Sequence, residues 1–137
     1  MRILLVDDTK AIAAMISAFL QLEGDFEVES QVDGDAAFRH YCQHGPYDLV
    51  VTDYDHPGMD GLVLSRAIRK KNPKQSIAAF TSNGSAEMTH RFQRLHIPLL
   101  EKGRPSAVEV VQFLKDAIGK GHSKPTTRRK AGRRASA

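Results

Sequence analysis

The chain has 137 residues, which is enough for one domain with a hydrophobic core and too short for two ordinary ones. Apolar residues make up 41% and charged residues 26%, as in soluble globular proteins, and no apolar run approaches the ~18 residues that would cross a bilayer. The first residues do not resemble a secretion signal, and one cysteine excludes an internal disulfide, so we expect a cytoplasmic protein.

The net charge of +4 is unevenly distributed along the chain. Residues 119–137 contain seven of the 20 lysines and arginines and none of the 16 acidic residues, so residues 1–118 carry a net charge of about −3. Because residues 119–137 also lack large apolar side chains, we expect them to form a basic disordered tail. This tail could attract nucleic acid or an acidic partner, or it could be a solvated terminus without a partner.

Short apolar runs alternate with longer segments of helical periodicity through residues 2–118. In chain order, the pattern predicts a strand at 2–6, a helix at 9–23, a strand around 26–28, a helix at 34–44, a strand at 47–52, a helix at 60–71, a strand at 77–81, a weaker helix at 85–95, a strand at 98–101 and a helix at 105–118. This alternation predicts an α/β domain with a parallel sheet that helices cover on both faces.

Side chains that can take part in chemical reactions stand at the ends of four of the five predicted strands. Asp7 and Asp8 follow the first strand, Asp53 follows the third, Thr81 ends the fourth, and Lys102 follows the fifth. In an open α/β sheet, ligands bind beyond the carboxyl ends of the strands, so we expect these five residues to meet in one crevice.

The chemistry of such a group is specific. Three carboxylates would repel one another, and Mg²⁺ removes that conflict because it prefers oxygen ligands. One carboxylate could then act as a nucleophile toward phosphorus, with Lys102 and Thr81 as partners for the transferred group.

The motifs resemble those of response-regulator receiver domains. Residues 51–61 (VTDYDHPGMDG) are similar to the phosphorylation loop of that family, and residues 3–8 (ILLVDD), Thr81 and Lys102 match the rest of its signature in order and spacing. The resemblance covers residues 2–118 and implies a flavodoxin-like, doubly wound, five-stranded sheet in the order 2-1-3-4-5 with five helices.

The resemblance implies roles for individual residues. Asp53 would accept the phosphoryl group, and Mg²⁺ would be bound by Asp8, by Asp53, by the backbone carbonyl of Asp55 and through water by Asp7. Lys102 would pair with the phosphoryl group and Thr81 would move toward it, while four further residues would shape the loop: Pro57, Met59, Asp60 and Gly61.

Two positions depart from the family pattern. The residue after the lysine is usually proline with a cis bond, but here Gly103 follows Lys102. The switch aromatic usually lies three residues before the lysine, but here that residue is Leu99. These departures leave the expected phosphorylation chemistry intact and concern the step that follows it.

Each residue also has an ordinary structural explanation. Asp7 and Asp8 could cap a helix, Thr81 could be a β-branched strand residue and Lys102 a solvated charge. Cys42 is expected to pack, and a pair of histidines, His40 and His44, could bind zinc or could simply lie on an exposed helix face. The convergence of four strand ends favours the functional interpretation.

The sequence therefore predicts a stand-alone, non-enzymatic response regulator of a two-component phosphorelay. A histidine kinase or phosphotransfer protein would phosphorylate Asp53, the domain would assist this transfer and its own slow dephosphorylation, and residues 85–118 would form the face for an unknown downstream protein. The alternatives are a phosphorylation-independent binding module and a regulator that associates with nucleic acid through the tail.

Overall fold

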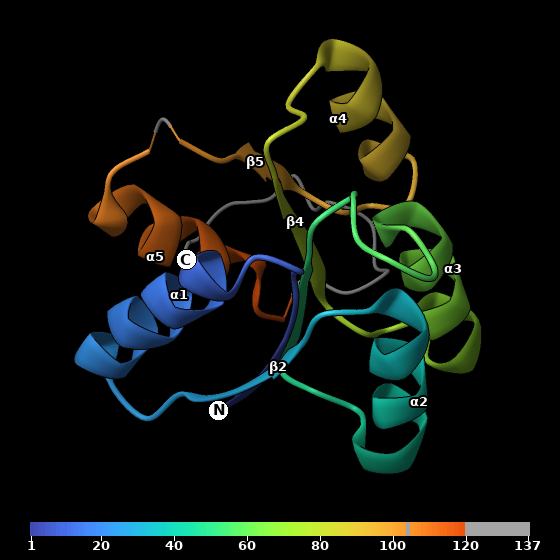
Figure 1. Cartoon of the computed structure of the whole chain (residues 1–137), viewed down its shortest axis with the longest axis horizontal. Helices are drawn as coiled ribbons and strands as arrows, with labels where there is room; N and C mark the ends of the chain where they lie inside the picture. Colours follow the sequence, from blue (N-terminus) through green and yellow to red (C-terminus); the bar gives the residue numbers. More distant parts are fainter. Residues whose placement is uncertain (104, 120–137) are drawn as a thin grey trace.

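The computed structural model describes residues 1–103 and 105–119. These residues form five strands and five helices that alternate along the chain (Figure 1). In order they are β1 (Arg2–Val6), α1 (Lys10–Glu23), β2 (Glu27–Gln31), α2 (Gly34–His44), β3 (Leu49–Thr52), α3 (Gly61–Lys71), β4 (Ile77–Thr81), α4 (Ala86–Gln93), β5 (Leu99–Glu101) and α5 (Ala107–Ala117).

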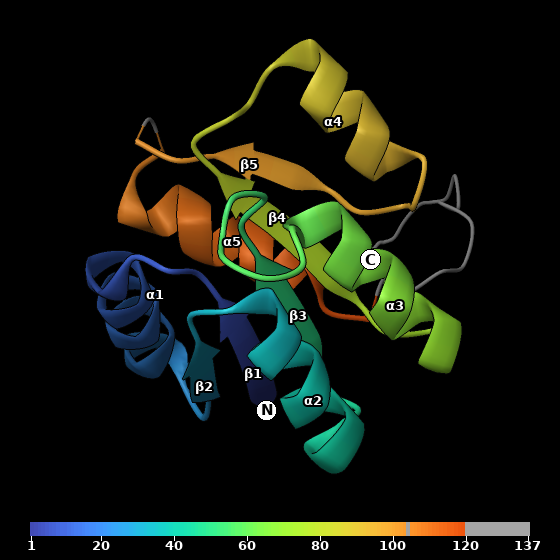
Figure 2. The same ribbon diagram turned by 45° about the vertical axis from the view of Figure 1, so that its right-hand side comes forward.

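The strands form one parallel sheet in the order β2-β1-β3-β4-β5. Helices α1 and α5 lie on one face of the sheet, and α2, α3 and α4 lie on the other (Figures 1 and 2). The predicted α/β class, strand order and helix number are therefore confirmed. The order reverses between β1 and β3, so the carboxyl ends of these two central strands lie at the switch point where such folds bind ligands.

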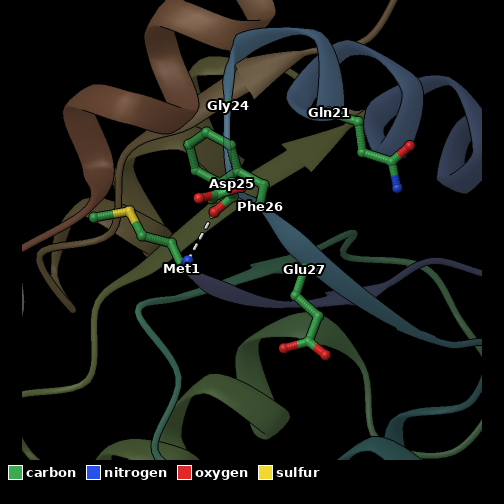
Figure 3. A pocket seen from close by; sticks show the side chains of 6 residues that line it. All are labelled: Met1, Gln21, Gly24, Asp25, Phe26 and Glu27. Carbon is green, nitrogen blue, oxygen red and sulfur yellow. Dashed lines mark hydrogen bonds between the residues drawn. The ribbon is translucent and has the colours of Figure 1, made fainter.

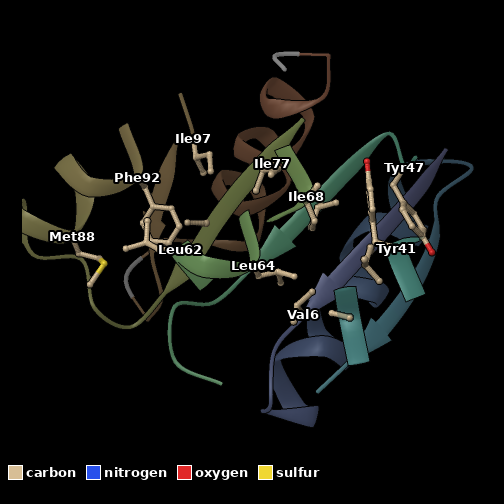
Figure 4. Close-up of a cluster of buried hydrophobic side chains, with 14 residues drawn as sticks. Val6, Tyr41, Tyr47, Leu62, Leu64, Ile68, Ile77, Met88, Phe92 and Ile97 are labelled. Atoms are coloured by element: carbon tan, nitrogen blue, oxygen red, sulfur yellow. The ribbon is translucent and has the colours of Figure 1, made fainter. Parts of the chain in front are cut away.

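Successive residues of the central strands point to opposite faces of the sheet and build two cores. Leu4 and Val6 of β1 belong to the core beneath α2, α3 and α4, whereas Ile3 and Leu5 belong to the core beneath α1 and α5. Figure 4 shows the first core, in which Phe92 of α4 packs beside residues of α3. Burial on both faces explains why the central strands are continuously apolar rather than alternating.

Local signals set most element ends close to the predicted positions. α1 ends at Glu23, and its C-cap Gly24 has a φ of 144°, which is unfavourable for other residues. α5 begins two residues later than predicted, because Ser106 is its N-cap and forms a capping box with Glu109, which leaves Pro105 outside the helix.

Two side chains on the helices, Val108 and Cys42, are exposed, and Cys42 was expected to pack. Val108 is 78% exposed because it lies about 200° around α5 from the buried Val110. Cys42 is exposed on α2, outside the buried stripe that contains Ala37 and Tyr41. The apolar type of these residues suggested burial, but the position around each helix decides it.

Two further predictions concern the basic tail and the membrane. Apart from Gly119, the predicted tail lies outside the described residues, so the structure does not test its predicted binding to nucleic acid or an acidic partner. No helix in the described part of the chain is long and apolar enough to span a membrane.

Candidate functional site

Asp7 and Asp53 lie side by side because the two central strands end in register. Val6 of β1 pairs with Thr52 of β3, and each aspartate is the next residue along its strand. The Asp53 N–H donates to the Val6 carbonyl at 3.0 Å, which extends the ladder up to the acceptor candidate. Both carboxylates are buried, with 2% of Asp7 and 6% of Asp53 exposed. Sheet register thus places two negative charges together in a largely dry environment.

Lys102 joins the two carboxylates. Its Nζ lies 2.7 Å from Asp7 Oδ2 and 2.8 Å from Asp53 Oδ2, and only 12% of its side chain is exposed. Burial by itself lowers the pKa of Lys102, but hydrogen bonds and charge interactions with Asp53 and Asp7 outweigh it, so the net pKa is raised. Lys102 therefore remains a cation between two carboxylates.

Asp8 completes an acidic group suited to a metal ion. Asp7, Asp8 and Asp53 each offer a carboxylate oxygen within 4.8 Å of the others, and Asp8 is exposed to solvent whereas the other two are buried. An all-oxygen donor set with an open side fits Mg²⁺, which retains several waters. The three carboxylates exceed the single charge of Lys102 by two, which a divalent cation would balance. The side chain of Asp55 lies outside this group and is exposed.

Backbone amides orient the remaining carboxylate oxygens. Asp53 Oδ1 accepts a 2.7 Å hydrogen bond from the Tyr54 N–H, and Asp7 Oδ1 accepts a 2.8 Å hydrogen bond from the Thr9 N–H. Each buried carboxylate therefore has one oxygen bound to a backbone N–H and the other bound to Lys102. This arrangement fixes the direction of the Asp53 carboxylate before any ligand binds.

Thr81 lies at the same edge of the sheet but makes different contacts. Its side chain is fully buried, and its hydroxyl oxygen accepts a 3.2 Å hydrogen bond from the Asn83 N–H. Its carbonyl accepts a 2.8 Å hydrogen bond from the Lys102 N–H, which links the ends of β4 and β5. The structure thus brings Asp7, Asp8, Asp53 and Lys102 into contact distance, with the Thr81 hydroxyl bound to its own loop.

The loop from Tyr54 to Asp60 is held by two close backbone approaches. A side chain on Gly61 would meet the Asp53 carbonyl oxygen at 2.2 Å, and a side chain on Gly34 of α2 would meet the Met59 carbonyl oxygen at 2.0 Å. The Gly34 N–H also donates to the Pro57 carbonyl at 2.7 Å. Asp60 is the N-cap of α3 and accepts from the Val63 N–H. The sequence motif suggested the loop but not its contact with α2.

The two departures from the family pattern have clear structural counterparts. The Lys102–Gly103 bond is trans, and Gly103 turns the chain with a φ of 89°, a left-handed conformation that favours glycine. Leu99 is partly buried and packs against the core beneath α2, α3 and α4. The glycine thus supplies a turn after the lysine, and Leu99 supplies packing without an aromatic ring.

Sequence reasoning missed two residues beside the site. Tyr54 contacts Asp53 through its N–H, and its ring lies 5.9 Å from the guanidinium carbon of Arg91 on α4. His56 lies 3.1 Å from the Thr52 hydroxyl through Nε2, and its Nδ1 is buried without a hydrogen-bond partner in the described chain. Their places in the loop were visible in the sequence, but the contact of Tyr54 with α4 depends on the tertiary fold.

The histidine pair on α2 belongs to a different cluster. His40 Nε2 lies 2.7 Å from Glu29 Oε1, and the rings of His40 and His44 are 4.5 Å apart. The Tyr47 hydroxyl donates to the same Glu29 oxygen at 2.6 Å. Among the described residues, the acidic group at the sheet edge is the cluster with three ligands at metal-binding spacing. Glu29 thus engages the partly buried His40 in a structural network rather than leaving both rings on an exposed face.

A surface hollow lies at the opposite edge of the sheet. It is lined by the N-terminus, the end of α1 and the α1–β2 connection, among them Met1, Gln21 and Phe26 (Figure 3). The α-amino group of Met1 donates to the Asp25 carbonyl there at 2.7 Å. This hollow is wide and open and brings together no catalytic set, so the acidic edge is the stronger functional candidate.

A parallel sheet in this order, with an acidic group and a lysine at its carboxyl edge, is the architecture of a receiver domain. The model of the response regulator receiver domain family matches residues 3–98, and the chain belongs to that family. Members of the family serve two-component systems, are phosphorylated on aspartate and bind Mg²⁺. The match ends before Lys102, so the place of Lys102 in the site is supported by its contacts with Asp7 and Asp53.

Individual relatives agree with this assignment. The chain is 30% identical to the probable chemotaxis protein CheY of Rhizobium etli over 97 residues, which covers 69% of this chain and 74% of that protein. The solved chemotaxis response regulator CheY4 of Vibrio cholerae is 26% identical, with a TM-score of 0.75 over 85% of this chain and 98% of that one.

Other relatives are much longer than this chain. A protein-glutamate methylesterase/protein-glutamine glutaminase of Nocardioides is 39% identical over 82 residues, but the match spans 22% of its length. The first curated relatives are matched over less than a third of their length. What these whole proteins do is therefore not carried over to this chain.

Proposed function

We propose that this domain accepts a phosphoryl group on Asp53 from the phosphohistidine of a kinase or phosphotransfer protein. The observation that carries the proposal is the pairing of Lys102 with Asp53 and Asp7 beside the exposed carboxylate of Asp8. A merely structural ion pair would not require a third carboxylate within 4.8 Å. The domain acts as a signalling switch that assists its own phosphorylation and slow dephosphorylation.

The transfer follows from the positions of the charged groups. A carboxylate oxygen of Asp53 attacks phosphorus, the P–N bond breaks, and the imidazole nitrogen keeps the electron pair and takes a proton. Lys102 and the hydroxyl of Thr81 stabilise the charge on the phosphoryl oxygens. To reach those oxygens, the Thr81 hydroxyl gives up the hydrogen bond that it accepts from the Asn83 N–H. Asp8, Asp53 and the carbonyl of Asp55 would hold Mg²⁺, with Asp7 acting through water; when bound, Mg²⁺ supplies positive charge to the phosphoryl oxygens.

The output proposed for the domain is a change in the face formed by α4, β5 and α5. α4 is the shortest of the described helices, with eight residues, and its buried residues are Met88 and Phe92. An element with so few buried contacts needs little free energy to move. The new charge of about −2 at Asp53 would shift α4 and the Thr81 loop between two positions, and a downstream protein would bind one of them.

Phosphorylation of the full chain by acetyl phosphate with Mg²⁺ tests the proposal. Intact-mass measurement should show one added phosphoryl group, which is absent in Asp53→Ala. Asp55→Asn is the matched control, because only its backbone carbonyl is assigned a role, and it should still be modified. Equal modification of wild type and Asp53→Ala would refute the assignment.

A further inference from the structure

A response of α4 to the state of Asp53 requires contacts that join the two. Besides the loop of Thr81, one series of contacts among the described residues joins them through Tyr54. The Tyr54 N–H binds Asp53 Oδ1 at 2.7 Å, and the Tyr54 ring lies 5.9 Å from the guanidinium carbon of Arg91. The first contact is with the carboxylate that would be modified, and the second is with the helix that would move.

We propose that Tyr54 and Arg91 couple the state of Asp53 to the position of α4. This inference rests on the proposed phosphorylation of Asp53. Modification of Asp53 changes the charge and geometry at the oxygen that the Tyr54 N–H binds. The Tyr54 ring packs against the core, which restricts its movement relative to the backbone, and α4 carries the cation that lies over that ring.

The surroundings of both residues favour coupling. Tyr54 packs against the same core as Met88 and Phe92, the two buried residues of α4. Arg91 has no carboxylate within ion-pair distance in the described chain, so no salt bridge competes for its guanidinium group. The interaction free energy of a guanidinium within about 6 Å of an aromatic centroid is large enough to shift a two-state equilibrium by roughly two- to fivefold.

The coupling must also act in the reverse direction. Linkage requires that a ligand which fixes α4 in one position changes the affinity of the Asp53 site by the same factor. Loss of the Tyr54–Arg91 contact should therefore weaken communication in both directions. It should leave the acidic group and Lys102 intact, because neither residue supplies a ligand or an ion pair to that group.

Amide NMR of the full chain with Mg²⁺ and beryllofluoride, a phosphoryl mimic, tests this inference. In wild type, saturation should shift the amides of Asp53, Lys102 and α4. In Arg91→Gln and Tyr54→Leu, the shifts at Asp53 and Lys102 should persist, whereas those of α4 should become smaller, because the equilibrium between the two positions of α4 changes roughly two- to fivefold. Tyr54→Phe keeps the ring and should respond as wild type does.

Arg94→Gln is the matched control, because it removes an exposed cation at the end of the same helix. It should retain the full α4 response. An undiminished α4 response in Arg91→Gln or Tyr54→Leu would overturn the coupling while leaving the proposed function intact. Absence of any shift at Asp53 in wild type would instead overturn the proposed function. Either substitution breaks the same contact, so failure of one variant to fold leaves the other as the test.

Discussion

Lys102 affects both the stability of the fold and the binding properties of the acidic group. Its ammonium group lies within 2.8 Å of two buried carboxylates that would otherwise repel each other. A buried cation that loses a partner is costly, and the same holds for the carboxylates when the cation is removed. The charge that stabilises the metal-free domain also competes with a divalent cation for the same oxygens.

Substitution of Lys102 separates these two effects. Without Mg²⁺, Lys102→Met should lower the free energy of unfolding by about 2–4 kcal/mol, because Asp7 and Asp53 lose their shared partner. The affinity for Mg²⁺ should rise roughly tenfold or more, because a competing positive charge is gone. Urea unfolding and Mg²⁺ titration by calorimetry measure the two quantities.

Lys115 provides the control for Lys102. It forms an exposed pair with Glu23 at 3.3 Å, and Lys115→Met should change the free energy of unfolding by less than about 1 kcal/mol without altering Mg²⁺ affinity. A weaker affinity of Lys102→Met for Mg²⁺ would contradict the competition between lysine and metal.

At the scale of elements, the contact between α2 and the loop before α3 depends on a glycine. A side chain on Gly34 would meet the backbone of Met59 at 2.0 Å, and backbone cannot give way as a flexible side chain can. Gly34→Ala should therefore destabilise the domain by about 2–3 kcal/mol and displace the loop that follows Asp53.

Gly103→Ala is the comparison for Gly34→Ala. No described residue lies within 4 Å of a Cβ built at Gly103, so its substitution carries the conformational cost of φ at 89°, about 1–2 kcal/mol. Thermal unfolding of both variants, with amide NMR of residues 54–60, gives the result. A Gly34→Ala variant with an unperturbed loop spectrum would show that the close approach is not needed to position the loop.

Glu29 connects the edge strand β2 to its neighbours through hydrogen bonds and charge interactions. Hydrogen bonds from the Tyr47 hydroxyl and from His40 hold the pKa of Glu29 below its usual value, with a smaller contribution from Arg2. A lowered folded pKa means that the ionised carboxylate is favoured in the folded state. The resulting stability is present above pH 4.5, the ordinary value, and is lost as the pH falls through the lowered folded value.

Substitution of Glu29 should accordingly have a pH-dependent effect. Glu29→Gln should lose more stability at about pH 7 than at a pH below the lowered folded pKa of Glu29, where the wild-type carboxyl group is also neutral. Tyr47→Phe, which removes the largest cause of the lowered pKa, should reduce the pH dependence in the same direction. Urea unfolding across this pH range measures the effect, and a loss that is equal at both pH values would contradict it.

At the scale of the whole molecule, the site joins the ends of strands that lie far apart in sequence. A ligand held by Asp8 and Asp53 connects β1 to β3 and stabilises the folded state, because the unfolded chain cannot assemble the ligands. Mg²⁺ at about 100 times its dissociation constant should add ~2.7 kcal/mol, seen as a rise in the melting temperature.

Asp8→Asn should abolish most of this rise, because it removes the exposed carboxylate of the acidic group. Asp116→Asn on α5 should leave the rise unchanged, since Asp116 bonds only to the neighbouring Gln112 among the described residues. A full Mg²⁺ effect in Asp8→Asn would exclude Asp8 as a ligand.

The sequence by itself determined the type and order of the elements. Apolar runs and helical periodicity are local properties, so they predicted five strands and five helices within a few residues. The sequence also brought Asp7, Asp8, Asp53 and Lys102 together, because strand ends meet at one edge of a parallel sheet. These inferences required only the chain order and the rule of parallel pairing.

Only the tertiary structure decided contacts between elements that no local pattern encodes. The exposure of Val108, the approach of Gly34 to Met59 and the place of the Tyr54 ring near Arg91 all depend on how helices pack against loops. Such distances reflect the packing of the whole chain rather than the propensity of a segment. The grouping of Asp53 with Asp7, Asp8 and Lys102 was therefore predictable from sequence, whereas the contact between Tyr54 and α4 became visible only in the folded molecule.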